Sequence, residues 1–573
     1  MRERPELKLK PPSISARRAA LAARNPIWRS ETLDQALARV VQEYGERPYL
    51  LTDDLRWTYE DVLAQAENFA PGLASLGVRP GERVGLIMAN HPIFVPIAFA
   101  VWRLGAVLIP LNFAFRSQEL AYVIEQSRCR LLITMNAFRH LDYLAMLDEL
   151  APGWESDVRS RFPDLETVVL HGDRRPGVLT VDDVLSRGAA DPSSLTPDTA
   201  SALDTAVIMY TSGTTGAPKG VQQSHDALLR NAYCTAYHRA YMDGWRVLFA
   251  LPLYHAFALV KGVLSPLWVG GAIIPQLTFD PVDTFAAIER HRANDALFVP
   301  TMVMALLEHP EAANYDFSSM IAVLSGAAPT PVYAWQRLID LFGLAEVVTG
   351  YGMTELAGAT MMTEPGDPLA IVETTIGRPI SAGVAGLPEL GGLIAEYRTA
   401  DPVTGAFLPD GAEGELVCRS PMQTSGYFAM PEQTIALFTD EGWVRSGDLG
   451  RIRPDGYVEL SGRSKELYKS GGELVSPREV EDLLVSHPAV AQAFVCGLPD
   501  DRWGEVGAAW VVLAPEQECT EAELIEMCKQ RLAKYKQPRH VFFLAADELP
   551  KTPTGKVQKF LLIQRGLRAL ERA

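Results

Sequence analysis

The feature that most constrains the fold is a series of short apolar runs that alternate with amphipathic helical patterns. Val84–Met88, Leu131–Thr134 and Ile321–Leu324 are examples of these runs. Short apolar runs between turn signals are typical of buried strands, and strands that alternate with helices favour a parallel sheet. The pattern therefore predicts an α/β protein with a large N-terminal part made of layered α/β subdomains.

The character of the chain changes near residue 415. Short strands and turns over residues 415–460 predict a small β-rich subdomain, and the tail then reads as a compact α+β unit. Because 573 residues suffice for two or more domains, we place a domain boundary near residue 464.

Composition excludes several classes of protein. The net charge of −17 argues against a nucleic-acid partner and against an anionic membrane surface. The six cysteines form no metal-binding or C-x-x-C spacing, so we expect reduced packing residues in a cytoplasmic protein. Residues 1–24 lack the apolar core of a secretory signal, so we expect a surface arm, with a transit peptide as the alternative. No segment predicts integral membrane association.

One loop is rich in small hydroxyl residues and glycine. It is Tyr210-Thr-Ser-Gly-Thr-Thr-Gly-Ala-Pro-Lys-Gly220, and it follows a predicted buried strand, Thr205–Met209. Successive backbone amides in such a loop can bind phosphate oxygens, and Lys219 adds a positive charge. The glycine spacing differs from that of the P-loop. Taken alone, the stretch also fits an ordinary polar turn.

Eight motifs, in order along nearly the whole chain, resemble those of the adenylate-forming superfamily, which includes the acyl-CoA synthetases. They are Tyr210–Gly220, Pro252-Leu-Tyr-His255, Leu324-Ser-Gly-Ala-Ala-Pro329, Gly350-Tyr-Gly-Met-Thr-Glu355, Arg445-Ser-Gly-Asp448, Gly462-Arg463, Gly471-Gly472-Glu473 and Pro550-Lys-Thr-Pro-Thr-Gly-Lys556.

The resemblance implies an ATP-dependent ligase that converts a hydrophobic acid first to acyl-AMP and then to acyl-CoA. ATP, Mg²⁺ and coenzyme A are the implied cofactor and substrates. It also implies an adenylation domain over residues 1–463, a hinge at 464–466 around Lys465, and a lid domain over 467–573. A homodimer is left open.

The resemblance assigns roles residue by residue. Lys556 would bridge the carboxylate and the α-phosphate, Thr354 would contact the phosphate, His255 would lie near the carboxylate, and Glu355 would hold Mg²⁺. The implied nucleotide site consists of Thr211, Ser212, Gly213, Thr214, Thr215, Lys219, Gly326, Ala327, Ala328, Tyr351, Gly352, Met353, Asp448 and Arg463.

Two further sets of residues are implied to surround the acyl group and the thiol. The acyl pocket would be lined by His255, Phe257, Lys261, Gly326, Gly350, Ala357 and Gly358. The loop beside coenzyme A would be Ser470, Gly471, Gly472 and Glu473.

Lys261 stands out in an otherwise apolar segment. If residues 255–268 form a helix, Lys261 shares a face with Phe257, and we hypothesise that it meets a polar or anionic group at the distal end of the acid. The alternative is that its ammonium reaches solvent.

Three rival functions remain at this point. An amino-acid adenylating enzyme that loads a carrier protein is disfavoured because no aspartate follows His255 to pair with an α-ammonium. A luciferase-like oxygenase is compatible with the chemistry but lacks a Ser-Lys-Leu ending. A catalytically inactive sensor is disfavoured by the presence of Lys219, Glu355, Asp448 and Lys556.

Overall fold

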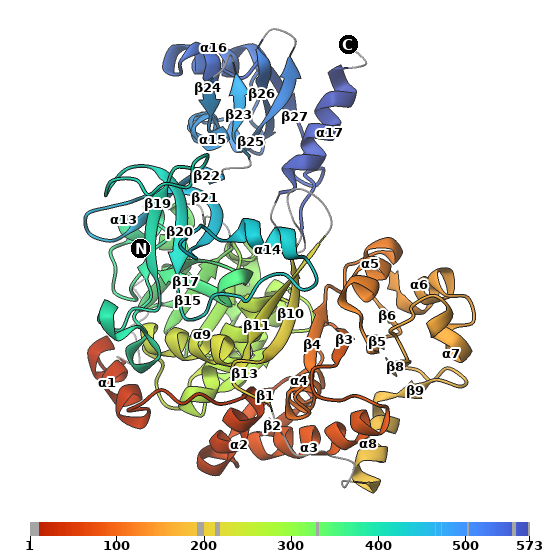
Figure 1. Ribbon diagram of the computed structural model, residues 1–573. Helices are drawn as coiled ribbons and strands as arrows, with labels where there is room; N and C mark the ends of the chain where they lie inside the picture. The colour runs from red at the N-terminus through yellow and green to blue at the C-terminus, as the bar shows by residue number, and fades with distance from the viewer. Residues whose placement is uncertain are drawn as a thin grey trace. The chain divides into compact units, whose positions relative to one another are not determined.

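The computed structural model describes residues 11–191, 200–211, 218–327, 330, 332–463, 466–470, 473–500, 503–552 and 557–570. The chain divides into two compact units, Met1–Glu396 with Arg419–Phe438 and Tyr397–Cys418 with Thr439–Ala573. The larger unit is a layered α/β structure and the smaller is an α+β structure (Figure 1). The predicted fold class is therefore confirmed. The boundary expected at 464–466 stays a prediction, since residues 464 and 465 lie outside the described residues.

A nine-stranded sheet forms one half of the larger unit, in the order β18-β17-β16-β15-β14-β12-β13-β1-β2. Its strands are β1 (Pro48–Leu51), β2 (Arg56–Thr58), β12 (Arg246–Phe249), β13 (Ala272–Pro275), β14 (Asp295–Phe298), β15 (Ala322–Gly326), β16 (Glu346–Met353), β17 (Gly358–Met362) and β18 (Arg378–Pro379). In this order, the six neighbouring strands β16, β15, β14, β12, β13 and β1 run parallel to one another. Both β14 and β15 are buried along their whole length, as expected for parallel strands covered on both faces.

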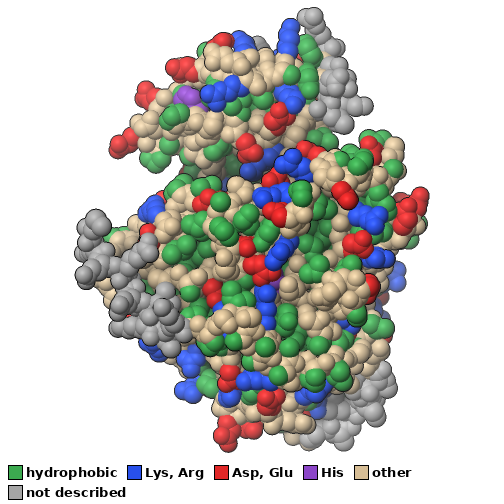
Figure 2. Space-filling view, turned by 90° about the vertical axis from the view of Figure 1, so that its left-hand side faces the viewer, with side chains coloured by type: hydrophobic (Ala, Val, Ile, Leu, Met, Phe, Trp, Pro, Cys, Tyr) green, Lys and Arg blue, Asp and Glu red, His purple; other side chains and the backbone are tan. Residues whose placement is uncertain are grey.

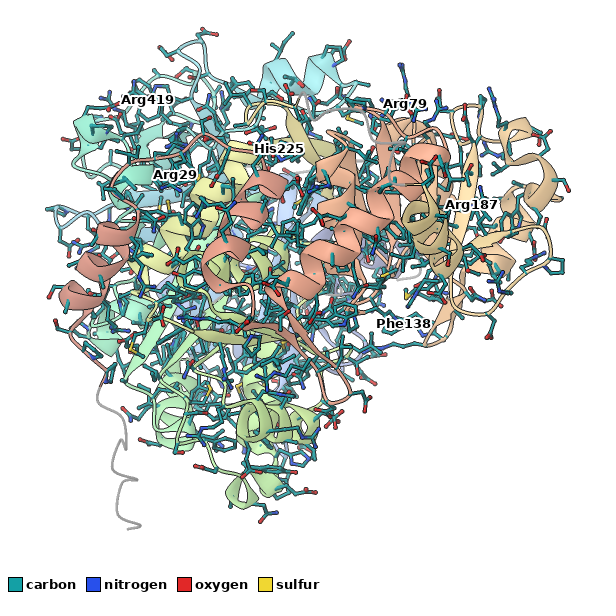
Figure 3. The ribbon with its side chains drawn as sticks, turned by 90° about the horizontal axis from the view of Figure 1, so that it is seen from below. Arg29, Arg79, Phe138, Arg187, His225 and Arg419 are labelled. Atoms are coloured by element: carbon teal, nitrogen blue, oxygen red, sulfur yellow. The ribbon has the colours of Figure 1, made fainter. Side chains whose placement is uncertain are left out.

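A seven-stranded sheet forms the other half, in the order β11-β10-β4-β3-β5-β8-β9. Its strands are β3 (Arg83–Ile87), β4 (Val107–Leu111), β5 (Leu131–Met135), β8 (Thr167–His171), β9 (Leu179–Thr180), β10 (Thr205–Thr211) and β11 (Lys219–Ser224). β10 and β11 are antiparallel, and their last paired residues are Thr211 and Lys219. The predicted phosphate loop runs between these two residues in the sequence, and its positions 212–217 lie outside the described residues. A two-stranded ribbon, β6 (Ala137–Phe138) and β7 (Leu141–Asp142), follows β5 and carries Phe138 (Figure 3).

The larger unit also contains the α-helices that follow α1 (Ile14–Arg24) in the chain, up to α14. They are α2 (Leu33–Tyr44), α3 (Tyr59–Ser75), α4 (Phe94–Arg103), α5 (Ser117–Ser127), α6 (Tyr143–Leu150), α7 (Trp154–Asp157), α8 (Val181–Ala190), α9 (His225–His238), α10 (Pro281–His291), α11 (Pro300–Glu308), α12 (Val332–Phe342), α13 (Leu369–Thr374) and α14 (Pro431–Leu437). Capping boxes begin α2, α3 and α8, where Thr32, Thr58 and Thr180 accept a backbone N–H of the first turn. His225 begins α9, and its Nδ1 accepts the Leu33 N–H at 3.2 Å (Figure 3).

The segment expected to form one helix over residues 255–268 does not do so. Phe257–Leu264 is a π-helix, and Ser265–Val269 continues as a 3₁₀ turn. The Ser265 N–H reaches back five residues to the Val260 carbonyl, and Gly262 lies so close to Phe249 that a Cβ there would be 2.6 Å from the ring. The segment is helical, as the hypothesis about Lys261 supposed, but apolar periodicity does not distinguish these helix types from a regular α-helix.

The expected N-terminal surface arm is, over its described part, a packed helix. α1 (Ile14–Arg24) begins at the N-cap Ser13 and buries Arg17 and Leu21. The Arg17 guanidinium forms a buried ion pair with Glu346, the first residue of β16, and Arg18 pairs with Glu364 at 2.6 Å. Two arginines of this segment thus attach it to the rest of the larger unit.

The smaller unit contains two sheets. The first has the order β19-β20-β21-β22 and consists of β19 (Glu396–Ala400), β20 (Gly414–Arg419), β21 (Val444–Ile452) and β22 (Val458–Arg463). The second consists of β23 (Tyr468–Ser470), β24 (Glu473–Val475), β25 (Val490–Asp500), β26 (Gly504–Leu513) and β27 (His540–Phe543). Its helices are α15 (Pro477–Val485), α16 (Glu521–Arg531) and α17 (Lys559–Leu570). Tyr468 is buried where Gly497 and Gly507 leave room for its ring.

The described part of the surface carries both signs of charge. On the face in Figure 2, acidic and basic side chains lie interspersed among apolar and uncharged ones. None of the helices in the described ranges is both long and apolar enough to span a bilayer.

The glycine-rich segment 382–396 forms two 3₁₀ turns, Gly383–Ala385 and Pro388–Leu390. A Cβ on Gly386 would lie 2.3 Å from the Gly392 carbonyl oxygen, so this close backbone crossing requires glycine.

Candidate active site

The carboxyl ends of β15 and β16 bring several predicted site residues together. The two strands are parallel neighbours, and Gly326 pairs with Gly350 in their register. β16 then pairs with the antiparallel β17, so that Gly352 lies opposite Ala359 and Met353 opposite Gly358. Because ligands in open α/β sheets bind beyond the carboxyl ends of the strands, this edge is the expected place for a site.

Two alanines at this edge have a backbone conformation that is rare for alanine. Ala327 has φ +70° and Ala357 has φ +58°. Non-glycine residues in the left-handed region cost free energy and cluster at functional sites. Both residues are predicted site positions, so the backbone strain coincides with the motifs.

Phe257, the first residue of the π-helix, faces this edge. A Cβ on Gly326 would lie 3.7 Å from the Phe257 ring, so the glycine leaves only van der Waals contact there. The π-helix is buried from Ala258 to Leu264, so protein atoms and not solvent lie behind Phe257. We call this buried segment the wall behind Phe257. π-Helical turns are frequent at functional sites.

Lys261 lies within the π-helix and is only 2% exposed. Its Nζ donates hydrogen bonds to Asn231 Oδ1 at 3.2 Å and to Thr235 Oγ1 at 2.8 Å, both on α9. Burial lowers the pKa of Lys261 to about 7. The alternative in which the ammonium reaches solvent is therefore wrong.

Asn231 connects this lysine to the wall of the predicted acyl pocket. Its Nδ2 donates to the carbonyl of Ala359 at 3.1 Å and to that of Leu356 at 3.4 Å. A Cβ on Gly358 would meet the Asn231 amide at 3.3 Å. One side chain thus separates the Lys261 ammonium from the backbone that carries Ala357 and Gly358.

Glu355 is held by a residue that the sequence did not single out. Its Oε1 accepts the Tyr427 hydroxyl at 2.8 Å, and its backbone carbonyl accepts the Thr424 N–H at 2.8 Å. The Lys219 ammonium lies 4.8 Å from the centre of the Tyr427 ring. Burial, together with the Glu355 carboxylate, raises the pKa of Tyr427, so its hydroxyl remains a donor. One tyrosine thus contacts both the predicted phosphate-loop lysine and the predicted metal ligand.

The neighbouring residue, Thr354, is fixed through its backbone. Its carbonyl accepts the Nε2 of Gln223 on β11 at 2.7 Å. β11 begins at Lys219, so this contact connects the hairpin with the end of β16. Tyr351 pairs with Met361 within the sheet.

His255 precedes the π-helix and packs against Tyr254, with 4.4 Å between the ring centres. Its side chain is partly exposed, yet the surrounding protein lowers the pKa of its imidazole to about 4. The ring is therefore neutral near pH 7, where it can accept or donate one proton.

Asp448 and Arg463 lie in the smaller unit. They are cross-strand partners on β21 and β22, with 3.0 Å between Arg463 Nε and Asp448 Oδ1. Ser470 is buried on β23 and pairs with Gly504, while Glu473 begins β24. Several predicted residues lie outside the described residues: Ser212, Gly213, Thr214, Thr215, Ala328, Lys465, Gly471, Gly472 and Lys556.

The described residues offer few ligands for a magnesium ion. In the described ranges, no group of three or more His, Cys, Asp or Glu side chains could hold a metal ion. A single carboxylate still fits Mg²⁺, which is commonly bound by one or two carboxylates together with substrate phosphates and waters. Glu355, oriented by Tyr427, is the residue that would hold it.

Comparison with known proteins decides the family. The model of the AMP-binding enzyme family matches residues 37–428, and that of the AMP-binding enzyme C-terminal domain matches residues 479–556. The chain belongs to the AMP-binding enzyme family. The resemblance inferred from the motifs is thereby confirmed, together with the class of AMP-forming acid–thiol ligases to which the relatives' names point.

Two curated relatives of this AMP-binding enzyme match most of its length. The medium-chain acyl-CoA ligase ACSF2, mitochondrial, of Danio rerio is 32% identical over 551 residues, with 94% of this chain and 88% of the relative covered. The 3-[(3aS,4S,7aS)-7a-methyl-1,5-dioxo-octahydro-1H-inden-4-yl]propanoyl:CoA ligase of Rhodococcus jostii is 32% identical, with 93% and 98% covered.

A solved structure also matches. The crystal structure of the anthranilate CoA ligase AuaEII in complex with anthranoyl-AMP superposes with a TM-score of 0.79 at 26% identity, with 94% and 98% of the two chains covered.

Proposed function

We propose that this AMP-binding enzyme is an ATP-dependent carboxylic acid–CoA ligase. In the first half-reaction a carboxylate oxygen attacks the α-phosphorus of ATP, which forms acyl-AMP and releases pyrophosphate. In the second, the thiol of coenzyme A attacks the acyl carbon, a thioester forms, AMP leaves, and the thiol proton passes to solvent. A carboxylate is a poor electrophile, and adenylation converts its oxygen into part of a good leaving group.

The observation that carries the proposal is the arrangement of Lys219, Tyr427 and Glu355. The Lys219 ammonium lies 4.8 Å from the centre of the Tyr427 ring, and the Tyr427 hydroxyl donates to the Glu355 carboxylate at 2.8 Å. One aromatic side chain therefore contacts both a cation and a carboxylate. The cation suits phosphate oxygens, and the carboxylate suits a hard metal ion. Mg²⁺, when bound, would neutralise charge on the phosphates.

Other residues take roles on the nucleotide and on the reacting groups. Thr354 would donate to phosphate, Tyr351 would lie against adenine, and Asp448 would accept the ribose hydroxyls with Arg463 beside it. Lys556 would stabilise the charge that develops between carboxylate and α-phosphate. We propose that residues 464–466, around Lys465, are the hinge between the domains at 1–463 and 467–573, and that Ser470–Glu473 approaches the thiol.

The acid we propose is hydrophobic and carries a hydrogen-bond acceptor distant from its carboxylate. Small residues, Gly326 and Gly350, leave volume beside Phe257. Asn231 and Thr235 occupy two of the three N–H groups of Lys261, and neither of them is an anion. The Rhodococcus relative is named for an acid with ring ketones, a group of the required kind.

Two assays on the purified enzyme test the function. We expect carboxylate-dependent exchange of pyrophosphate into ATP, and thioester formation with free coenzyme A. Exchange without transfer to free coenzyme A would favour an enzyme that loads a carrier protein. Absence of both, across a panel of aliphatic, alicyclic and aromatic acids, would contradict the proposal.

A pair of variants tests the assigned roles. Lys556→Ala should lose exchange and still convert supplied acyl-AMP to thioester, whereas normal exchange would refute the role of Lys556. Lys261→Met should lower kcat/KM by about tenfold for an acid with a distal ketone and leave its alkyl analogue nearly unchanged, as expected for the loss of a charge-assisted hydrogen bond. An equal loss for both acids would refute distal recognition.

A further inference from the structure

One isolated bridge and one backbone hydrogen bond join the residues on either side of the Lys556 segment, and we call these joined residues the stem. Lys551 and Val557 are paired as an antiparallel bridge, and the Gln558 N–H donates to the Pro550 carbonyl at 2.8 Å. Residues 553–556 lie between these contacts in the sequence. Whatever fixes the stem therefore fixes the described residues that flank positions 553–556 in the chain.

Lys559 follows the stem directly and begins α17. Its Nζ lies 2.7 Å from Glu466 Oε2 and 2.6 Å from Glu481 Oε1. The three side chains are only 16%, 25% and 11% exposed. Burial lowers the pKa of Lys559, but the carboxylates of Glu481 and Glu466 outweigh this and raise it, so the ammonium stays charged at neutral pH.

The two carboxylates connect Lys559 with two other parts of the smaller unit. Glu481 is on α15, and its Oε1 also accepts the Val495 N–H of β25 at 2.7 Å, so the sheet holds it in place. Glu466 is the last residue of the proposed hinge, 464–466. The Lys559 ammonium thus joins the stem to Glu481, which is held by β25, and to Glu466, the last residue of the proposed hinge.

The balance of charge makes this cluster dependent on Lys559. Two partly buried carboxylates within reach of one atom repel each other unless a cation lies between them. If the cation is removed, the carboxylates should separate, and the stem loses its attachment to Glu466. Replacing Glu466 with glutamine instead keeps the Lys559–Glu481 ion pair. It removes only the ion pair between Lys559 and Glu466.

We propose that Lys559 is a positioning residue for the adenylation half-reaction: its ammonium fixes the stem of the Lys556 segment relative to Glu466. The inference rests on the proposed function, because Lys556 acts in the first half-reaction. Thioester formation from acyl-AMP does not use Lys556, so it does not depend on Lys559. A positioning role for Lys559 therefore predicts a loss in the first half-reaction alone. A general contribution to stability predicts a loss in both half-reactions.

The test uses the full-length enzyme and two separate assays. Lys559→Met should lower kcat for pyrophosphate exchange by about tenfold or more, with little change in the KM for ATP, because a charge-assisted attachment is lost. Conversion of supplied acyl-AMP to thioester should stay within about twofold of the wild type. Lys559→Arg, which keeps the charge and can contact two carboxylates, should restore most of the exchange.

Lys529→Met is the matched control, since Lys529 is an exposed lysine of the same unit that pairs with Glu526 at 3.4 Å. It should leave both rates unchanged. If Lys559→Met does not fold, Glu466→Gln provides the same test with the Lys559–Glu481 pair intact. Normal exchange in these variants, or an equal loss in both half-reactions, would overturn the proposal. A wild-type enzyme inactive in both assays would instead refute the proposed function.

Discussion

The hydroxyl of Tyr427 donates a hydrogen bond to Glu355, with 2.8 Å between the oxygen atoms. The two residues are 72 positions apart in the chain, and the contact connects the turn before α14 with the end of β16. The same tyrosine ring faces the Lys219 ammonium. Tyr427 therefore positions the two charged groups that we propose to act on the phosphates.

Tyr427→Phe should weaken adenylation. The substitution removes the donor that orients the Glu355 carboxylate and keeps the ring beside Lys219. A hydrogen bond to a charged group contributes about 1.5–3 kcal/mol, so we expect pyrophosphate exchange to fall by about tenfold or more. The loss should shrink as the Mg²⁺ concentration in the assay rises.

Tyr59→Phe is the matched control for that experiment. Tyr59 is the first residue of α3, and its buried hydroxyl donates to the carbonyl of Gly271, just before β13, at 2.7 Å. Exchange should stay normal in this control. Equal losses in the two variants, or no magnesium dependence, would refute the role of Tyr427.

Preference for a distal acceptor on the acid should depend on pH. With a pKa of about 7, Lys261 is an ammonium below that pH and a neutral amine above it. The ratio of kcat/KM for a keto acid to that for its alkyl analogue should therefore fall severalfold as the pH rises through about 7, because charged donors bind more strongly. Lys261→Met should give a ratio that does not change with pH. A pH-dependent ratio in that variant would exclude Lys261 as the titrating group.

Asp295→Asn should destabilise the larger unit. Asp295 Oδ1 and Oδ2 accept two hydrogen bonds from Arg239, at 2.7 and 2.5 Å, and both side chains are almost fully buried. Removing one partner of a buried pair leaves an uncompensated charge and costs about 3–5 kcal/mol of unfolding free energy. Urea denaturation measures this cost.

The exposed pair Lys529–Glu526 is the control. Glu526→Gln should change the unfolding free energy by less than about 1 kcal/mol. A similarly small effect of Asp295→Asn would show that the buried guanidinium finds another acceptor.

Stability should fall as the solution becomes acidic. Burial lowers the pKa of His225 and of His238 to about 4, from the usual 6.5. The unfolded chain therefore binds protons that the folded protein does not between pH 6.5 and 4, so stability is complete above that window and is lost as the pH falls through it.

His225→Asn isolates one of these groups. An amide can accept the Leu33 N–H, as His225 does now, but it does not titrate. The variant should lose less unfolding free energy than the wild type between pH 7 and 5, by roughly 1–2 kcal/mol. An unchanged pH dependence would mean that other groups determine acid stability.

Much of the fold follows from local sequence patterns. The strands β3, β5 and β15 lie within one or two residues of the predicted apolar runs, because a fully buried parallel strand leaves a continuous apolar signal. α1 was missed because its buried arginine is paired with Glu346, far away in the sequence. Such pairing has no local signature.

The site was predictable where motifs carry it and not where long-range contacts complete it. Gly326 and Gly350, which pair across β15 and β16, both lie in motifs. Tyr427 and Asn231 lie in none: Tyr427 binds Glu355, 72 residues away, and Asn231 binds Lys261, 30 residues away. Gly426, with φ +135°, was the one local sign that the chain before Tyr427 turns sharply. The cytoplasmic location stays a prediction, and one relative is named mitochondrial.

The π-helix behind Phe257 also affects how the specificity of such an enzyme can change. A π-helical turn holds one more residue than an α-helical turn in the same length of backbone. Deleting a single residue between Phe257 and Leu264 would allow tighter, α-helical winding over nearly the same length and would change which side chains of the segment face the site. Insertions and deletions, and not only substitutions, are therefore a route by which the binding preference at this wall could diverge.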